Sequence, residues 1–346
     1  MPLRPNGPKT MPGLRLALPL GVVAVLLVAC GSADPSPASM DGAAPSTVRV
    51  LTNGVLGNDR EPAQACGPEA APDAGAADPA TIVAIGTGAL DTVCALGLQG
   101  RVVGAAVDGP DPHYLGPWAV EAQRVGGDGQ VDRAAVRAAA PELILVAPGP
   151  DGAAPQLPAD LSDIAPVTVV EPEQDWTTAV REAGDALGRT TAIDALIDDY
   201  RTQAREVGEQ RAATQTQISL LRFTDDAAEL VGPTSLPGRV LAEAGFRRPP
   251  GQRFTDSPVR AVDADDLSDA EADFMFLMFA GKNTGLSDTG GRPDSEEYGR
   301  TVMGSSAWEE IDVTAHRTWV VDDHVWFNGG GLVAAATILE DVAAVL

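Results

Sequence analysis

The stretch TTAIDALIDDYRTQAREVGEQRAA, residues 190–213, determines how the rest of the chain can be organised. Its apolar residues recur at the spacing of one helix face, and charged residues lie between them; they are Ile193, Leu196, Ile197, Tyr200 and Val207. At 1.5 Å per residue, such a helix spans roughly 30–35 Å, which is long for the middle of a globular chain. The sequence therefore predicts one long amphipathic helix with folded chain on both sides of it.

Short apolar strands alternate with helical stretches before this long helix. The candidates are strands at 81–85, 101–105, 143–147 and 167–170, and helices at 86–98, 132–139 (capped by Asp132) and, more weakly, 157–164. Strand–helix alternation with short links is typical of a parallel sheet that is covered on both faces. We therefore predict an N-terminal α/β lobe over residues 81–172.

A second strand–helix series follows the long helix. Its candidates are strands at 218–223, 274–279 and 319–321, and helices at 236–244 and 332–346. A shorter helix, at 176–187, precedes the long one. The predicted fold class is therefore α/β, with two strand–helix lobes joined by one long bridging helix. The C-terminal lobe covers 215–346 and the bridging segment covers 173–214.

Composition excludes several classes of function. The chain has 24 Lys and Arg against 49 Asp and Glu, a formal net charge of −25, and 44% apolar residues. Such a charge repels phosphate backbones, so the sequence predicts no nucleic-acid partner. Only three His are present, which argues against a protein-built zinc site. The motifs GxxxxGK[ST], HExxH, GxSxG and SxxK are absent, and we expect no enzyme and no cofactor.

The N-terminus is a targeting segment, residues 1–29. A basic start precedes an apolar run that is shorter than the roughly 20 residues of a membrane span. The run ends in LVACGS (27–32), which resembles a bacterial lipobox. The resemblance implies cleavage before Cys30, lipidation of that residue and a protein anchored on the extracytoplasmic face of the cell membrane. The alternative is an ordinary secretory signal with an incidental Cys.

Two cysteines remain after Cys30 is lipidated, and the compartment is oxidising. Cys66 and Cys94, 28 positions apart, are therefore expected to form a structural disulfide. Residues 32–80 are rich in Ala, Pro, Asp and Gly, so residues 30–80 are predicted to be a tether. The disulfide would pin part of this tether, including 48–60, against the folded body.

A two-lobed layout with one long helix, behind a lipobox, resembles the iron-siderophore substrate-binding proteins of ABC importers. Local segments are similar to the actinobacterial ferric-citrate-type (FecB-like) lipoproteins: VLGNDR (55–60), LDTVCALGLQ (90–99), YLG (114–116), QRFTD (252–256) and DHVW (323–326). The resemblance implies a fold like the class III periplasmic binding proteins. It also implies that a ferric siderophore, or haem, is captured between the lobes and delivered to a permease.

One feature departs from the family pattern. In the importer relatives each lobe presents a Glu to the permease, and the positions expected for it here hold Ala134 and Ala264. Nearby acids could substitute, namely Asp132 on the first lobe and Asp263 and Asp265 on the second. The alternative function is an envelope-interaction lipoprotein that keeps the fold without a role in transport.

Ligands of open α/β sheets bind at the carboxyl ends of the strands, so the candidate site residues come from the loops there. An anionic ferric chelate would be bound by cationic side chains, and aromatic rings could stack on its flat faces. The predicted ligand-binding residues are Arg222, Arg253, Lys282, Tyr114, Trp118, Phe254, Trp326 and Phe327. The alternatives are surface cations and core aromatics. His113 with Tyr114 is a further candidate, as axial ligands of a haem iron.

Overall fold

The computed structural model describes residues 55–57, 59–127, 129–149, 155–171, 175–281 and 294–346. Residues 44–346 form one compact unit, and the description concerns that unit by itself. The targeting segment, Cys30 and Lys282 lie outside the described residues. Among the residues that are described, no helix is long and apolar enough to span a membrane.

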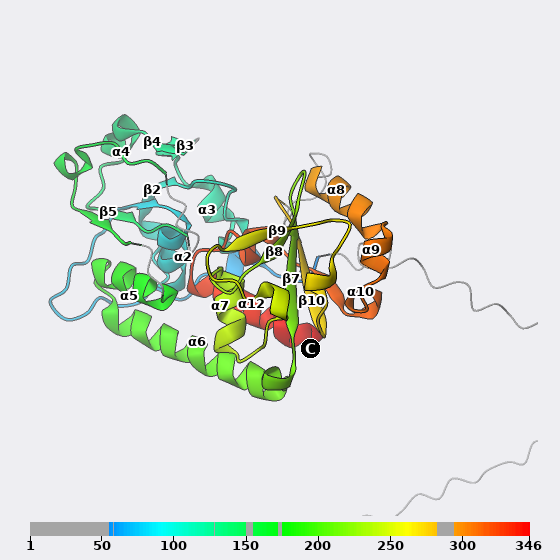
Figure 1. Ribbon diagram of the computed structural model, residues 1–346. Coiled ribbons are helices and arrows are strands. Elements are labelled where there is room, and N and C mark those ends of the chain that lie inside the picture. Colours follow the sequence, from blue (N-terminus) through cyan, green and yellow to red (C-terminus); the bar gives the residue numbers. More distant parts are fainter. Residues whose placement is uncertain (1–54, 58, 128, 150–154, 172–174, 282–293) are drawn as a thin grey trace, which may run out of the picture. The chain divides into compact units, whose positions relative to one another are not determined.

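The N-terminal lobe is built on a parallel four-stranded sheet (Figure 1). Its strands run in the order β2 (Val102–Ala106), β1 (Ile82–Ile85), β5 (Leu143–Val146) and β6 (Val167–Val169). All four side chains of β1 are fully buried, as expected of a central strand covered on both faces. The lobe also contains α2 (Thr87–Ala95), α3 (Pro117–Glu121), α4 (Arg133–Ala139) and the two-residue strands β3 (Gly126–Gly127) and β4 (Gln130–Val131).

The predicted helix at 157–164 is wrong. Only Leu161–Asp163 forms a turn of 3₁₀ helix, because the backbone is left-handed at Asp160, with φ of 67°, and Pro166 follows closely. The other predicted helices and strands of this lobe are present. The lobe boundaries at 81, 173 and 215 stay a prediction, and both sheets lie inside them.

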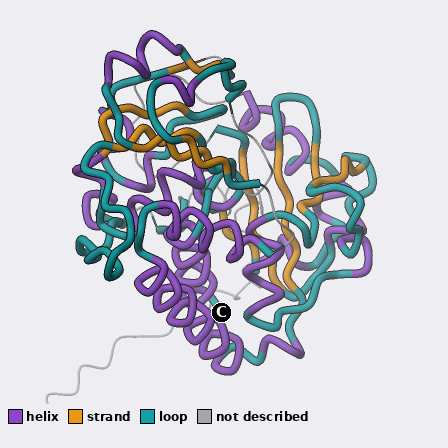
Figure 2. Tube along the Cα trace, turned by 90° about the vertical axis from the view of Figure 1, so that its left-hand side faces the viewer, coloured by secondary structure: helices purple, strands orange, loops and turns teal. Residues whose placement is uncertain are grey.

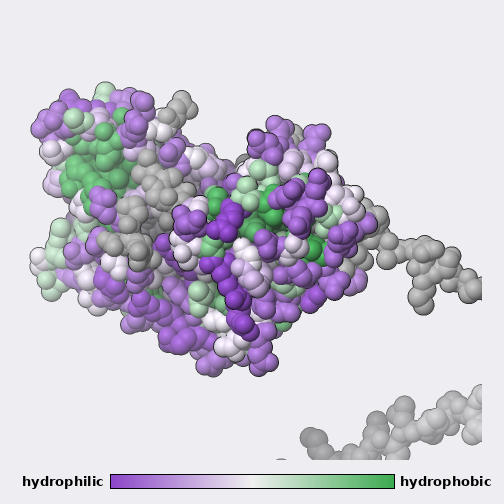
Figure 3. Space-filling view, in the orientation of Figure 1, coloured by the Kyte–Doolittle hydropathy of each residue, from purple (hydrophilic) through white to green (hydrophobic). Residues whose placement is uncertain are grey.

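The long helix α6 (Thr190–Gln210) has 21 residues and follows α5 (Trp176–Ala186). It buries one stripe of side chains, and its buried residues are Ile193, Ile197, Tyr200, Ala204 and Gly208. It ends three residues earlier than predicted because the backbone turns left-handed at Ala212. Hydrophilic side chains cover its outer face (Figure 3), so α6 is amphipathic, as its sequence predicts.

The C-terminal lobe has a five-stranded mixed sheet in the order β11, β10, β7, β8, β9. The strands β7 (Ile218–Phe223), β10 (Phe274–Phe279) and β11 (Thr318–Val320) pair in parallel. The strand β8 (Ala228–Val231) pairs antiparallel with both β7 and β9 (Val259–Val262). The helices are α7 (Leu236–Glu243), α8 (Asp294–Met303), α9 (Ser306–Glu309), α10 (Val313–His316), α11 (Asp323–Trp326) and α12 (Leu332–Val345). Figure 2 shows helices packed beneath the strands of both sheets.

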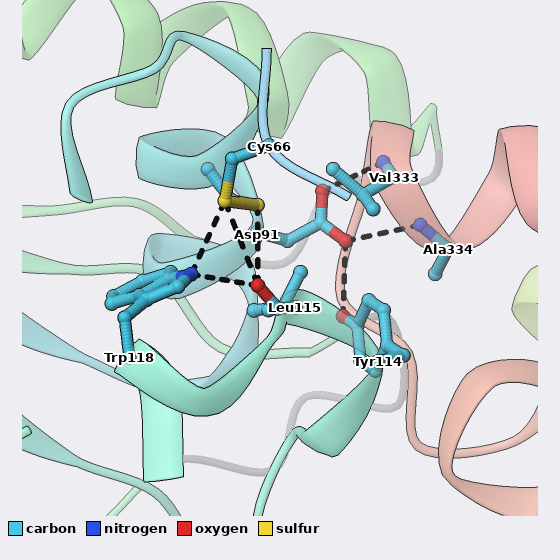
Figure 4. Close-up of a disulfide and its surroundings, with 8 residues drawn as sticks. Cys66, Asp91, Tyr114, Leu115, Trp118, Val333 and Ala334 are labelled. Atoms are coloured by element: carbon cyan, nitrogen blue, oxygen red, sulfur yellow. Dashed lines mark hydrogen bonds between the residues drawn. A yellow bond between two sulfur atoms is a disulfide. The ribbon is translucent and has the colours of Figure 1, made fainter. Parts of the chain in front are cut away.

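The C-terminal helix α12 is fixed to the N-terminal lobe by Asp91 of α2 (Figure 4). This carboxylate is fully buried and accepts hydrogen bonds from the first-turn amides of Val333 (2.9 Å) and Ala334 (3.1 Å). The Tyr114 hydroxyl donates to Asp91 at 2.9 Å and accepts from the Gly330 amide at 3.0 Å. An acid at a helix N-terminus is stabilised by the helix dipole, so this contact joins the two lobes.

Residues 55–80, apart from Asn58, form a strap that is packed on the body, where the sequence predicts a tether that the disulfide partly pins. Leu56 donates its amide to Val320 of β11 at 2.8 Å, and Arg60 pairs with Asp341 of α12. The predicted disulfide Cys66–Cys94 is present. Farther along, the fully buried Arg189 bonds the carbonyl of Ala70 and the carboxylate of Asp78. The strap therefore contacts both lobes.

Candidate functional site: the carboxyl ends of the two sheets

The carboxyl ends of the parallel strands supply the candidate site. In the N-terminal lobe β1, β5 and β6 lead into Gly86–Gly88, Ala147–Gly149 and Val170–Glu171. The helix α2 begins directly after β1, so its first amides point toward this edge. Side chains are small here because backbones approach closely: a Cβ on Gly88 would collide with the carbonyl oxygen of Pro148.

A small cavity of about 30 Å³ lies at this edge. Backbone of 147–149 and the side chains of Thr92, Glu171 and Trp176 line it, and Arg239 enters from the other lobe. This volume holds about one water molecule, which is too small for a whole chelate. The cavity can therefore form only the bottom of a larger binding site. Residues 150–154 and 172–174, which continue two of its loops, lie outside the described residues.

Arg239 was not among the residues predicted from sequence. It lies in the first half of α7, whose N-cap Ser235 accepts a hydrogen bond from the Gly238 amide at 3.2 Å. Burial lowers the pKa of its guanidinium, and the charges of Asp175 and Glu243 partly oppose that effect. The rule that ligands bind at the loops after the strands does not include a position inside a helix. Nothing in the local sequence indicates that this helix faces the other lobe.

Arg222 and Phe327 are two predicted residues that the structure brings together. The Arg222 guanidinium lies 4.0 Å from the centre of the Phe327 ring. Its Nε donates to Asp323 Oδ1 at 2.7 Å, and its Nη1 lies 3.4 Å from Glu229 Oε2. Burial alone would lower the pKa of Arg222, but these two carboxylates raise it overall. The charge is thus already matched, and an anionic ligand would compete with Asp323 and Glu229.

His324 received no role from the sequence but lies between the lobes. One ring nitrogen is 3.2 Å from the carbonyl oxygen of Asp111 in the N-terminal lobe, and the other is 3.3 Å from that of Gly281. The ring of His113 lies 5.7 Å away, and burial together with the charge of His324 lowers the pKa of His113. These side chains close one side of the boundary between the lobes.

Three of the predicted aromatic residues are not available to stack on a ligand, which corrects those predictions. Trp326 is fully buried in α11, where Nε1 donates to Asp341 Oδ2 at 2.8 Å and the ring lies 4.6 Å from that of Phe276. The Phe254 ring is buried beneath Arg260. Tyr114 is held by Asp91, as described above. The hydrophobic effect explains the positions of all three rings, because a large ring stabilises the fold more when it is buried in the core than when it lies on an exposed loop.

The same contacts argue against Tyr114 as an iron ligand. Burial raises the pKa of its hydroxyl well above the usual value, and Asp91 raises it further. The phenol therefore stays protonated while its oxygen is engaged by Asp91 and Gly330. The alternative of His113 and Tyr114 as paired haem ligands is wrong for this structure. Among the described residues, no group of three or more His, Cys, Asp or Glu could hold a metal ion.

The remaining predicted residues lie at separate places. Trp118 is half-buried against the disulfide, and its Nε1 donates to the Leu115 carbonyl at 2.7 Å (Figure 4). Arg253 is exposed, and its Nε donates to the carbonyl of Arg248 at 3.0 Å. Lys282, already noted, is not described. Arg253 and Trp118 as ligand contacts therefore stay predictions.

The acids predicted to face a permease are exposed on both lobes. Asp132 caps α4 by accepting from the Ala134 amide at 2.8 Å, and Asp263 accepts from the Asp265 amide at 3.0 Å. Ala134 is exposed and Ala264 half-buried. The local bonds use one oxygen of each capping carboxylate, which leaves the other open to solvent.

Comparison with known proteins gives matches of the predicted kind. No family model matches the chain. The achromobactin-binding periplasmic protein of Dickeya dadantii is 23% identical over 275 residues, 77% of this chain and 86% of that protein. The probable siderophore-binding lipoprotein YfiY of Bacillus subtilis is 25% identical over 194 residues, 53% of this chain and 57% of that protein.

Solved structures agree in fold. SirA of Staphylococcus aureus has a TM-score of 0.62 at 19% identity, covering 77% of this chain and 98% of SirA. The petrobactin-binding protein YclQ of Bacillus subtilis has a TM-score of 0.60 at 17% identity, covering 78% and 92%. These likenesses establish the two-lobed α/β fold. The predicted resemblance to iron-siderophore substrate-binding proteins is confirmed in sequence and in fold, whereas the narrower resemblance to the actinobacterial ferric-citrate type stays a prediction.

Proposed function

We propose that this protein binds a ferric siderophore between its lobes, without catalysis, and delivers it for ABC-type import. The observation that carries the proposal is the sequence match to a siderophore-binding protein over 77% of the chain. The geometry supports it, because the carboxyl ends of the parallel strands in both sheets supply the groups expected at such a site. Haem finds no support among the proteins named above.

Arg239 is the cation we assign to the chelate. It lines the cavity at the carboxyl ends of the strands, and its planar guanidinium can donate two parallel hydrogen bonds to a carboxylate or catecholate. Gly88, in the first turn of α2, lines the same cavity. The protein itself supplies no resident cofactor in this proposal, and the iron arrives as part of the ligand.

We place the protein on the extracytoplasmic face of the membrane, held by lipid on Cys30. The lipobox-like LVACGS segment supports this placement, and the similar YfiY is by name a lipoprotein. The Cys66–Cys94 disulfide fits an oxidising compartment. Cys30→Ala should release the protein from membranes into the medium or periplasm in a fractionation experiment. Retention of that variant in the membrane fraction would contradict the anchor.

Delivery to a permease is assigned to Asp132, Asp263 and Asp265. Replacing Asp263 and Asp265 by Asn should reduce uptake of radiolabelled ferric chelate by cells while leaving the affinity of the purified protein unchanged. The two Ala at the expected Glu positions favour the second candidate, an envelope-interaction lipoprotein without a transport role. Unchanged uptake after deletion of the gene would favour that candidate.

Ligand capture is tested by titrating the soluble protein, starting after Cys30, with a panel of ferric siderophores and haem. Trp176 lines the cavity, so its fluorescence should be quenched by the bound chelate. Arg239→Gln should raise the dissociation constant about tenfold or more, since a hydrogen bond to a charged group contributes about 1.5–3 kcal/mol.

Arg205→Gln is the matched control. Arg205 is exposed on α6, where its Nη2 donates to Thr202 Oγ1 at 3.0 Å, and it does not line the cavity. This variant should bind as the unmodified protein does. A panel in which no chelate quenches fluorescence or raises the melting temperature would overturn the proposed function.

A further inference from the structure

A groove of about 590 Å³ lies apart from the carboxyl ends of the sheets. The long helix α6, the C-terminal helix α12 and strap residues 60–67 form its walls. The two helices pack against each other along this region (Figure 1). Its volume falls within the range of about 300–1,000 Å³ that is typical of small-molecule sites. None of the residues assigned above to the chelate lines it.

The floor of the groove is apolar. It is made by Leu196 and Tyr200 of α6 and by Val333 and Ala336 of α12. The Tyr200 hydroxyl points elsewhere, because it donates to Glu243 at 2.5 Å. The small Ala336 side chain leaves the space between the helices open. An apolar floor of this kind binds the hydrocarbon part of a ligand.

The rim of the groove is acidic. Its charged residues are Glu61, Asp199, Glu340 and Arg60. Arg60 is already paired with the buried Asp341 and lies 3.6 Å from Glu340. Glu61 and Asp199 are exposed, and the structure gives their carboxylates no hydrogen bond or ion pair within the described part of the chain. The rim therefore presents uncompensated negative charge above an apolar floor.

We propose that this groove is a second ligand site, which takes a small organic cation with an apolar body, such as a protonated arylalkylamine. The apolar body packs on Leu196, Val333 and Ala336. The ammonium group faces Asp199 and Glu61. The groove and the chelate cavity share no lining residue, although the ring of Tyr200 in the groove lies 5.2 Å from that of Trp176 in the cavity.

The probe is 2-phenylethylamine, which is protonated at neutral pH, titrated into the soluble protein in a calorimeter. Phenylacetate and 2-phenylethanol carry the same ring with negative and no charge. We expect saturable binding of the amine, weaker binding of the alcohol and no binding of the acid. Binding of the amine should weaken as salt is added, because exposed charges are screened.

Asp199→Asn should weaken amine binding roughly two- to fivefold, the range expected for an exposed ion pair. Asp198→Asn is the matched control, since Asp198 is exposed on the same helix but does not line the groove, and it should bind as before. Ala336→Phe fills the groove and should abolish binding. Its melting temperature checks that it is folded, and Ala336→Leu offers a smaller obstruction.

Three results would overturn the proposal. They are no saturable binding of the amine, equal binding of the alcohol in place of a preference for the cation, and binding that persists in a folded Ala336→Phe variant. The last result would place the amine elsewhere on this acidic protein. The chelate titration is a separate measurement, so the loss of either site leaves the other one interpretable.

Discussion

Asp91 of α2 and Asp341 of α12 are buried carboxylates that fix the position of α12. Asp91 accepts two backbone amides of the first turn and the Tyr114 hydroxyl, and Asp341 accepts from Trp326 and Arg60. Burial raises the pKa of each to about 6, although these donors lower it. At the scale of single residues, α12 is therefore held by groups that titrate between pH 4 and 6.

The pH dependence of stability follows from the direction of these shifts. The folded pKa of Asp91 is about 6 and the unfolded value is 3.8. Folding therefore favours the protonated form. The stabilising contribution is complete below about pH 4 and is lost as pH rises through 6. The loss approaches about 3 kcal/mol for Asp91 at neutral pH, at about 1.36 kcal/mol per pKa unit.

Urea unfolding from pH 4 to 7 checks this prediction. Compared with the unmodified protein, Asp91→Asn should show a flatter dependence of the unfolding free energy on pH. The exposed Asp198→Asn should follow the unmodified profile. Parallel profiles for Asp91→Asn and the unmodified protein would show that Asp91 does not titrate in this range.

Trp326→Phe tests whether this ring is structural. The change removes the Nε1 donor of the buried Asp341, so the unfolding free energy should fall by about 1–3 kcal/mol. Chelate affinity should be unchanged, because the ring is fully buried. Trp319→Phe, at a half-buried ring in β11, is the comparison. A loss of chelate affinity with no change in the unfolding free energy would mean that Trp326 contacts the ligand after all.

At the scale of elements, the strap adds a connection between the lobes beside α6 and α12. It pairs with β11 through Leu56, with α12 through Arg60 and with α2 through the disulfide. Arg189, which precedes α6, bonds the strap at Ala70 and Asp78. The strap has little secondary structure of its own, so its position is set by its contacts with residues that are distant in the sequence.

Removing the disulfide should destabilise the protein by about 3–4 kcal/mol, the loop-closure entropy expected for Cys residues 28 positions apart. The double variant Cys66→Ser, Cys94→Ser should melt lower than the unmodified protein in non-reducing buffer. Under reducing conditions the two proteins should melt alike. Equal melting temperatures without reductant would mean that the strap holds its place without the bridge.

At the scale of the whole folded unit, one apolar core reaches into both lobes. The same buried cluster contains Ile82 of β1, Ile197 of α6, Phe276 of β10 and Ile338 of α12. Separate clusters cover the outer faces of the two sheets. Because the shared cluster requires both lobes, neither lobe buries its inner surface alone.

We therefore expect a single cooperative thermal transition, with calorimetric and van't Hoff enthalpies that agree. Differential scanning calorimetry of the soluble protein at pH 6 checks this. Tyr114→Phe, which removes the hydroxyl between Asp91 and Gly330, should lower the transition temperature without splitting it. Two resolved transitions in the unmodified protein would mean that the lobes unfold independently.

Much of the fold is predictable because it depends on local pattern. The apolar spacing in 190–213 predicts α6, and Asp132 caps α4 as the sequence predicts. The strands β8 and β9 and the helices α3 and α8 to α11 are not among the predicted elements. All of them except the ten-residue α8 are too short for periodicity to show.

The sequence by itself determined the class of the protein: two α/β lobes about a long helix, an acidic surface, a lipobox-like N-terminus and a cysteine pair. These follow from spacing and composition, which a linear chain displays directly. Only the tertiary structure decided which side chains reach the site. Trp326 and Tyr114 are buried in the core, and Arg222 forms an ion pair with Asp323. Arg239, on helix α7, lines the cavity. Exposure and pairing depend on residues distant in sequence, so no local pattern reveals them.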